Sequence, residues 1–435
     1  MKTFLFAISF FFPLLLPAQV LSLNEAVALA NQQNFHLQLA EHDIRLAREK
    51  VNELKTALSP KISTALDYKY YIDLPYQLMP SAVFGGPPGI YKEAQFGVPH
   101  NLNFSAQVTY PLVNYGIRAG IETAEKGVEL NELRKLKTAE DIALEVSNVY
   151  YNAQLLKNQE NFIDSNISNT QKLLQLTRLL YEQRMAKGTD VEKVDLQLSQ
   201  LHTQKINVEN QYQQALNVLK FLVGKPLSEP VGIVVDPGED QIPGLTENTL
   251  TEVRLTRQQI ELLHEEKRAI NKSTLPVINL TALYGTTGYA KTGSNDFVKF
   301  FPLGYAGLQV VFPISSGGAV KKKLMVKDVE IEKARTQIAL LEEKNAMEKL
   351  NIHRQLNTAF NNLKMNSQQI EHATNIYHNT LLLQKEGFAS LTDVLFADAT
   401  LREVQHNYMA NLVALRKAEL EYRKLTGNLL NHSNY

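Results

Sequence analysis

Two long segments without proline constrain the fold of this chain most. Residues 115–184 contain no proline and carry apolar residues spaced four, three, four and three apart, at Ile142, Val146, Val149, Ala153 and Leu156. This spacing is typical of a helix that packs in a coiled coil. At ~1.5 Å per residue, such a helix is about 105 Å long, which no compact globular domain accommodates. Residues 319–386 form a second such segment, with Ile352, Leu356, Ala359 and Leu363 along its stripe.

The chain also contains one pattern twice. Asp190 and Asp393 lie 203 positions apart, as do Gly224 and Gly427, and the apolar positions between them keep that offset. The stretch VTYPLVNYG at 108–116 returns as VVFPISSGG at 310–318. We therefore predict a tandem duplication of a helix, two strands, a long helix and a second helix. The predicted parts are a first repeat at 19–224, a linker or equatorial region at 225–246, a second repeat at 247–427 and a C-terminal tail at 428–435.

Each repeat begins with a shorter helix that a proline ends, at 22–58 and 247–274. Period-two alternation then predicts strands at 62–70 and 102–110 in the first repeat, and at 278–284 and 306–312 in the second. Residues 72–100, which are rich in proline and glycine, are predicted as a loop. The second strand has one consistently polar face, made by Asn101, Asn103, Ser105, Gln107 and Thr109. Tyrosine and phenylalanine near the expected strand ends fit an interfacial girdle: Tyr70, Tyr71, Tyr110, Tyr284, Tyr305 and Phe312.

The N-terminus predicts export from the cytoplasm. Residues 1–18 carry one lysine and a short apolar run with two prolines, which is typical of a secretory signal peptide. No cysteine follows, so we expect no lipid anchor. Beyond residue 20, no apolar run approaches the ~20 residues of a membrane helix, so a bilayer crossing would use strands. Four strands cannot close without unpaired edges in lipid, whereas three copies would supply twelve. Strands of this length also occur in soluble sandwiches.

Neither composition nor motifs indicate an enzyme. The 45 basic and 45 acidic residues balance, so no preference for nucleic acid follows, and cysteine is absent. The ten histidines form no metal-binding spacing, because His36 with His42 and His372 with His378 are six residues apart. No nucleophile or phosphate-binding motif is present. We therefore expect no catalytic activity, no cofactor and no metal.

With these features together, the sequence resembles the TolC-like outer-membrane efflux proteins over residues 22–427. The resemblance rests on the doubled turns YPLVNYG and FPISSGG, the tips KGTDV and GFASLTDV, and the endings LVGKPL and LTGNLL. It implies an α+β membrane protein: a tandem-repeat protomer with long antiparallel coiled-coil helices and four transmembrane β-strands. Three protomers would form a 12-stranded β-barrel and an α-helical periplasmic tunnel. The implied location is the outer membrane of a Gram-negative bacterium, extending into the periplasm.

The resemblance also implies partners. A homotrimer in outer-membrane lipid would work with a periplasmic adaptor (membrane fusion) protein and an inner-membrane RND or ABC transporter. Efflux of small molecules and type I protein secretion both remain open, and the sequence does not specify the substrate. An alternative from another class is a periplasm-spanning structural coiled coil without a pore.

The candidate aperture residues lie at the second tip. In the family, two aspartates one helical turn apart ring the periplasmic aperture. Asp393 matches the first, the second position holds Phe396, and Asp398 follows two residues later. A three-fold ring of Asp393 would favour cations, and Phe396 would add an apolar barrier. At the first tip, the equivalent residue Asp190 is a further aperture candidate, and N-terminal capping is the alternative role of both aspartates.

The tips are also the expected docking surface for the adaptor. The candidates at the first tip are Arg184, Lys187 and Gly188, where Arg184 replaces the turn glycine expected from the family. Those at the second tip are Gly387, Phe388 and Leu391, and packing against the neighbouring hairpin is the alternative for the two apolar residues. We further predict strand–helix boundaries at Tyr110, Pro111 and Gly116 and at Phe312, Pro313 and Gly318, with proline ending each strand and glycine admitting the turn.

Overall fold

The computed structural model describes residues 19–235, 248–291, 293 and 299–430. The predicted signal peptide, residues 236–246 of the predicted linker and residues 431–435 of the tail lie outside these ranges. The chain divides into two compact units. The helical unit comprises residues up to 44 together with 131–257 and 336–435, and the sheet unit comprises 45–130 and 258–335. Each unit therefore draws on both sequence repeats, and several long helices run through both.

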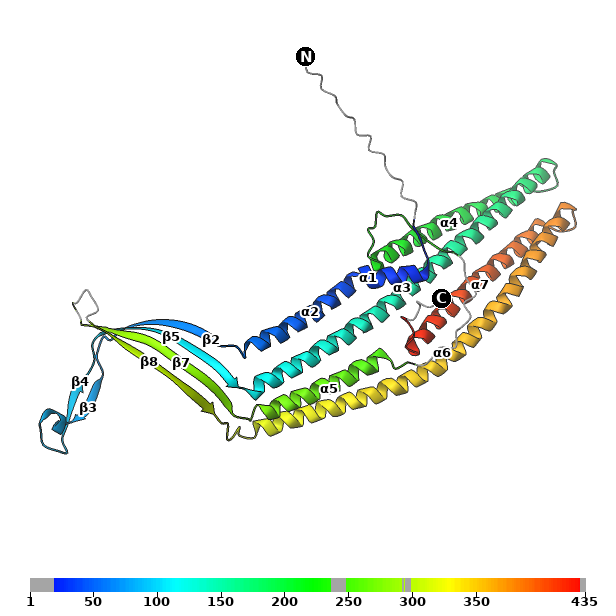
Figure 1. Cartoon of the computed structure of the whole chain (residues 1–435). Helices are drawn as coiled ribbons and strands as arrows, with labels where there is room; N and C mark the ends of the chain where they lie inside the picture. The colour runs from blue at the N-terminus through cyan, green and yellow to red at the C-terminus, as the bar shows by residue number, and fades with distance from the viewer. Residues whose placement is uncertain (1–18, 236–247, 292, 294–298, 431–435) are drawn as a thin grey trace, which may run out of the picture. The chain divides into compact units, whose positions relative to one another are not determined.

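The helices have nearly the lengths expected from the sequence. α3 spans Tyr115–Glu182 and α6 spans Ala319–Lys385, with 68 and 67 residues. The hairpin partners are α4, Gly188–Leu222, and α7, Leu391–Leu425, which both have 35 residues. The shorter helix of the second repeat is α5, Thr251–Lys272. The predicted coiled-coil hairpins are thus confirmed, since α4 follows α3 and α7 follows α6 across short tips (Figure 1).

The predicted first helix is two helices. α1 spans Leu23–Gln33 and α2 spans Phe35–Thr56, and Asn34 between them has an extended backbone. The Asn34 side chain is buried and donates to the carbonyl of Leu222 over 2.7 Å, while its oxygen accepts from the amide of His36 over 2.8 Å. The prediction of one continuous helix was wrong because the hydrogen bond from Asn34 to Leu222 stabilises the interruption of the helix at Asn34.

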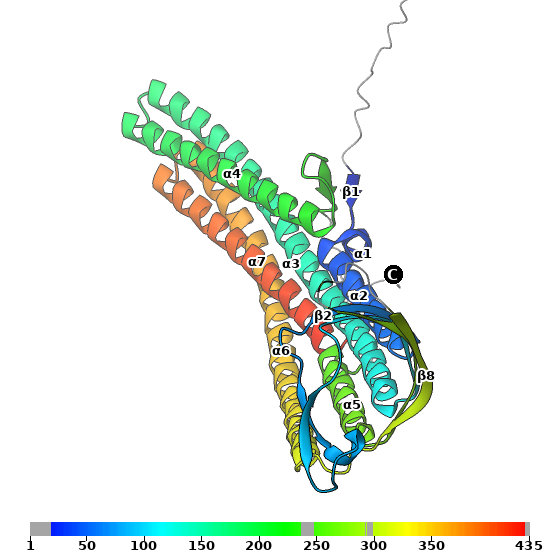
Figure 2. The same ribbon diagram turned by 90° about the vertical axis from the view of Figure 1, so that its left-hand side faces the viewer.

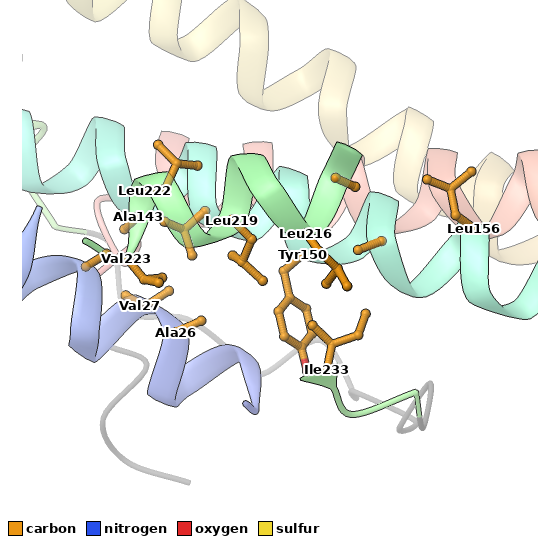
Figure 3. Packing of buried hydrophobic residues seen from close by; sticks show 14 of the residues in the cluster. Ala26, Val27, Ala143, Tyr150, Leu156, Leu216, Leu219, Leu222, Val223 and Ile233 are labelled. Atoms are coloured by element: carbon orange, nitrogen blue, oxygen red, sulfur yellow. The ribbon is translucent and has the colours of Figure 1, made fainter. Parts of the chain in front are cut away.

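The helical unit also contains a small parallel sheet, which was not predicted from the sequence. β1, Gln19–Leu21, pairs with β6, Val231–Ile233, which lies in the segment expected to be a linker. The hydroxyl of Tyr150 on α3 donates to the carbonyls of Leu21 and Val234, over 3.0 and 3.3 Å. Figure 3 shows Tyr150 beside Ile233 and among apolar residues of α1, α3 and α4. A buried tyrosine with a satisfied hydroxyl therefore fixes the sheet to the helices.

The heptad stripes predicted from the sequence form the core of the helical unit. Ile142, Val146, Ala153 and Leu156 of α3 are buried in one cluster with Leu201, Val208 and Leu219 of α4. In the second repeat, Ile352, Leu356 and Ala359 of α6 are buried with Leu415 and Ala418 of α7. Apolar burial along these seams stabilises the hairpins, at ~25 cal/mol per Å².

The sheet unit contains one four-stranded antiparallel sheet. Its strands are β2, Lys61–Tyr70; β5, His100–Val113; β7, Val277–Ala290; and β8, Lys299–Val311. Their order is β2-β5-β7-β8, so β2 and β8 are the free edges of the sheet within the described part of the chain. All four predicted strands exist, and β5, β7 and β8 are longer than expected by several residues, β2 by one. Tyr284 and Tyr305 consequently lie in mid-strand, so their predicted place near strand ends was wrong.

The register of this sheet separates an apolar face from a more polar one. Ile62, Val108, Ala282 and Ala306 are consecutive partners across the four strands, and so are Leu66, Phe104, Thr286 and Pro302. The polar residues predicted for β5 share the opposite face with residues such as Lys61, Ser63 and Asp67 of β2. Alternation along each strand therefore adds up to two distinct surfaces, as expected for strands with period two.

The predicted loop at 72–100 contains structure of its own. β3, Tyr76–Pro80, and β4, Tyr91–Gln95, pair as an antiparallel hairpin around a short 3₁₀ helix, Ser81–Phe84. This hairpin lies beyond the end of the four strands that is away from the helices (Figure 1). The proline and glycine residues on which the loop prediction rested lie in the connections between these elements and at the end of β3. Among the described residues, no helix is both long and apolar enough to cross a membrane.

Candidate functional site at the hairpin tips

The two tips turn at equivalent positions of the repeat. Gly387 has φ +82°, and Arg184, 203 positions earlier, has φ +59°. Arg184 is the only non-glycine residue with positive φ among the described residues. The first tip therefore keeps the left-handed turn although it lacks the glycine, at a steric cost for a residue with a Cβ. Gly188 is the first residue of α4 and does not make this turn.

At the second tip, Asp393 caps a helix. Its carboxylate accepts from the backbone amide and hydroxyl of Ser390, over 2.8 and 2.7 Å, and the Ser390 hydroxyl oxygen accepts from the amide of Asp393 over 3.3 Å. These hydrogen bonds with Ser390 hold the pKa of Asp393 below its ordinary value. The alternative capping role is thus present in the structure. Its role in an aperture stays a prediction.

The first tip repeats this arrangement more weakly. Asp190 accepts from the backbone amide of Lys187 over 3.3 Å and lies 3.5 Å from the ammonium of Lys193. Lys187 replaces the serine, so there is no hydroxyl to complete the cap. The predicted docking residues Arg184, Lys187 and Gly188 are all exposed.

Apolar residues at the second tip differ in exposure. Phe388 is 79% and Phe396 75% exposed, which is unusual for phenylalanine. Leu391 is partly buried against an apolar cluster, so the packing alternative holds for this residue. The predicted docking role of Phe388 and the predicted barrier role of Phe396 both require exposed side chains, and both stay predictions.

That apolar cluster joins the two hairpins near their tips. It contains Leu173 and Leu174 of α3, Val194 of α4, Ala373 and Tyr377 of α6, and Val394, Ala397 and Leu401 of α7. Figure 2 shows α4 and α7 side by side in this region. Polar contacts add to the cluster: Asn166 of α3 donates to Gln405 of α7 over 3.0 Å.

Asp398 belongs to this interface. Its side chain is buried, and the residue is 1% exposed. One carboxylate oxygen accepts from the amide of Gln197 on α4 and pairs with Arg402 over 2.9 Å, whereas the other has no hydrogen-bond partner among the described residues. The sequence led us to place Asp398 with the aperture residues and gave no indication of a role for Gln197. In the sequence, Gln197 is only a polar residue next to an apolar stripe.

Burial governs the electrostatics of this cluster. It raises the pKa of Asp398, and Arg402 and Gln197 oppose the shift only in part. Burial also raises the pKa of Tyr377, to about 12, with the nearby Asp398 charge as a smaller cause. A buried carboxylate with one unsatisfied oxygen makes the interface sensitive to the charge of Asp398.

The strand–helix boundaries are only partly as predicted. In the second repeat, β8 ends at Val311, so Phe312 and Pro313 follow the strand, and Gly318 has φ +80° just before α6. In the first repeat, Tyr110 and Pro111 lie inside β5, which continues to Val113 past an irregular register at Leu112.

The prediction that Pro111 ends its strand was therefore wrong. The irregular register accommodates the missing amide donor. Gly116 lies in the first turn of α3, and the Asn114 side chain accepts from the amide of Ile117 over 3.0 Å. Asn114 thus caps the start of α3 in the first repeat, whereas in the second repeat Gly318 makes the turn that precedes α6.

No group of three or more histidine, cysteine, aspartate or glutamate residues could hold a metal ion within the described part of the chain. The tips offer turns, caps, exposed aromatic residues and a polar interface between hairpins. These are features of a contact and packing site.

Comparisons with known proteins agree with this architecture. Residues 26–225 match the family described as Outer membrane efflux protein. The outer membrane protein TolC of Salmonella enteritidis is 20% identical over 319 residues, which are 71% of this chain and 62% of that protein. The chain thus aligns with a little under two thirds of this relative's length.

Solved structures match over a larger share. VceC, an outer membrane protein of Vibrio cholerae, superposes with a TM-score of 0.69 at 15% identity, covering 93% of this chain and 96% of VceC. CusC superposes with a TM-score of 0.74 at 13% identity, covering 93% and 91%. The resemblance to the TolC-like outer-membrane efflux family is confirmed.

The fold of this chain is therefore that of VceC and CusC. TolC and VceC are both outer membrane proteins, and an outer-membrane location of this chain stays a prediction. The relatives are named as efflux proteins and channels and not as enzymes.

Proposed function

We propose that this chain is one protomer of a trimeric outer-membrane channel in a tripartite efflux pump or a type I secretion system. The channel is a passive conduit across the outer membrane and the periplasm. A periplasmic adaptor and an inner-membrane RND or ABC transporter open it and supply the energy. The substrate is selected by the transporter, so small toxic molecules and secreted proteins both fit this chain.

The observation that carries this proposal is the four-stranded sheet with two free edges. One face is apolar and the other largely polar, as a wall between lipid and water requires. The edges β2 and β8 have unpaired backbone groups, each of which costs several kcal/mol in lipid. Because β2 and β8 run antiparallel, β8 of one copy can pair with β2 of the next, and repetition of this pairing closes the wall.

The tips supply the proposed gate. Three copies would bring three Asp393 side chains together, and crowded carboxylates favour cations. Phe396 would add an apolar barrier, and the exposed Phe388 with Arg184 and Lys187 would contact the adaptor. Loosening of the apolar cluster and of the Gln197–Asp398 contact would let the hairpins separate, and adaptor binding would favour the separated state.

Planar-bilayer recording of the purified protein tests the proposal. We expect unitary conductance steps with a cation preference. A periplasm-spanning scaffold without a pore, the second candidate, gives no steps. Asp393→Asn keeps the size of the cap and removes its charge, so it should reduce the cation preference. Asp195→Asn is the control, since Asp195 is an exposed aspartate of α4 outside the candidate aperture residues. An unchanged conductance and cation preference in Asp393→Asn would remove the aperture role.

The genes beside this one test the choice between pump and secretion system. Genes for an adaptor and a proton-driven transporter would indicate efflux. Genes for an adaptor and an ATP-driven transporter would indicate secretion.

A further inference from the structure

The polar face of the sheet has an apolar exception on β8. Phe301, Leu303 and Tyr305 pair with Thr287, Gly285 and Leu283 of β7, which puts them on the face of Asn103, Ser105 and Gln107. All three are substantially exposed. They lie in the half of β8 away from the helices, whereas Gly307 and Gln309 follow on the same face. A water-filled channel gives no reason for this apolar patch.

The β3–β4 hairpin has an apolar face of its own. Tyr76 and Leu78 of β3 lie on the same side as Tyr91 of β4, because Tyr76 pairs with Gln95, Leu78 with Glu93 and Pro80 with Tyr91. Glu93 and Gln95 of β4 share this side with them. Each of these three apolar side chains is more than half exposed. The opposite side has Gln77, Met79, Lys92 and Ala94, and so lacks large aromatic side chains. A two-stranded hairpin is marginally stable alone, so an exposed apolar face on it indicates a partner surface.

The topology decides which β8 is within reach. Residues 71–75 connect the hairpin directly to the end of β2, one free edge of the sheet, and β8 is the other free edge. The β8 of the same copy is three strand spacings away, about 14 Å, at ~4.8 Å per strand. In the edge-to-edge pairing of the proposed function, the neighbouring copy's β8 is one spacing away, about 5 Å. Residues 299–305 begin at the same end of the sheet at which β2 ends.

We infer that the β3–β4 hairpin of one copy packs its Tyr76 and Leu78 face onto Leu303 and Tyr305 of the adjacent copy. Three such contacts line the end of the channel away from the helices with apolar side chains and narrow it. This inference rests on the proposed function, because the apolar site is incomplete without the second copy. The hairpin joins the sheet near the backbone bond from Tyr71 to Pro99, 2.8 Å long, and near Gly97, which has φ +106°.

Cysteine cross-linking tests the contact, and the chain has no native cysteine to interfere. Leu78→Cys combined with Leu303→Cys, oxidised in detergent or in membranes, should give linked dimers and trimers on a non-reducing gel. Gln77→Cys with Leu303→Cys is the matched control on the opposite hairpin face and should stay monomeric on the gel. Tyr76→Ser with Leu78→Ser should raise the unitary conductance, since the narrowing is lost.

Three outcomes would overturn the inference. One is a disulfide formed only within a chain, identified by mass spectrometry. Another is equal cross-linking of the Gln77 control. The third is quenching of a bimane label on Leu78→Cys by nitroxide lipids, because the hairpin face would then lie on the membrane. If cross-links are absent while trimers and unitary steps persist, this inference fails and the proposed function stands. If trimers and steps are absent as well, the proposed function fails.

Discussion

The contact between Gln197 and Asp398 offers a quantitative test of how the two hairpins hold together. Gln197→Ala removes the donor on α4 and leaves the buried Asp398 carboxylate with Arg402 as its remaining partner. A hydrogen bond to a charged group contributes about 1.5–3 kcal/mol. At about 1.4 kcal/mol per tenfold change, separation of the hairpins should become roughly 10–150 times more frequent.

Hydrogen exchange measured by mass spectrometry reports this separation directly. Peptides from 187–200 and 390–403 should exchange faster by that factor in Gln197→Ala, because local opening exposes their amides. Peptides from β2 should not change. Gln200→Ala is the matched control, since Gln200 is exposed on the same helix.

Two results would refute the reasoning. An acceleration of less than about twofold would mean that the hydrogen bond contributes little to hairpin packing. An equal acceleration in Gln200→Ala would mean that helix α4, and not the contact with Asp398, was weakened.

The structure makes three further predictions. Because burial raises the pKa of Asp398, its protonated form favours the packed hairpins; this stabilisation is present below the ordinary value of 3.8 and is lost as pH rises through the higher folded pKa. Tip exchange, corrected for its intrinsic pH dependence, should therefore increase as pH rises from below 3.8 through the higher folded pKa of Asp398, and Asp398→Asn should abolish this contribution. Asp393 has the opposite sign, since its pKa is lowered. Asn34→Ala leaves the Leu222 carbonyl and the His36 amide without their side-chain partners. It should lower the free energy of unfolding of the helical unit, measured by chemical denaturation, by about 2–4 kcal/mol. Gln32→Ala, at an exposed position, is the control and should leave this free energy almost unchanged. Ser390→Ala removes the hydroxyl of the helix cap and should destabilise the first turn of α7 by about 1 kcal/mol. Amide hydrogen exchange at residues 391–394 should become faster in this variant, whereas Thr392→Ala, the control, should leave it unchanged.

The residues that sequence reasoning misjudged have a common cause. Asp195 and Asp398 are equivalent in the repeat, but Asp195 is exposed, whereas Asp398 is buried against α4. Asn34 interrupts a helix because the carbonyl of Leu222, 188 positions away, accepts its hydrogen bond. Pro111 continues a strand because an irregular register follows it. In each case the deciding partner is distant in sequence, so no local pattern contains it.

The sequence by itself determined the repeat, the two long hairpins, the four strands and the seam residues, since helix and strand periodicity and proline are local properties. It also determined which residues face each side of β5. Only the tertiary structure decided the strand order, the free edges at β2 and β8, the β1–β6 sheet, the β3–β4 hairpin and the burial of Asp398. These features depend on hydrogen bonds and packing between segments that are remote in the chain, where the partner, and not the residue alone, sets the free energy.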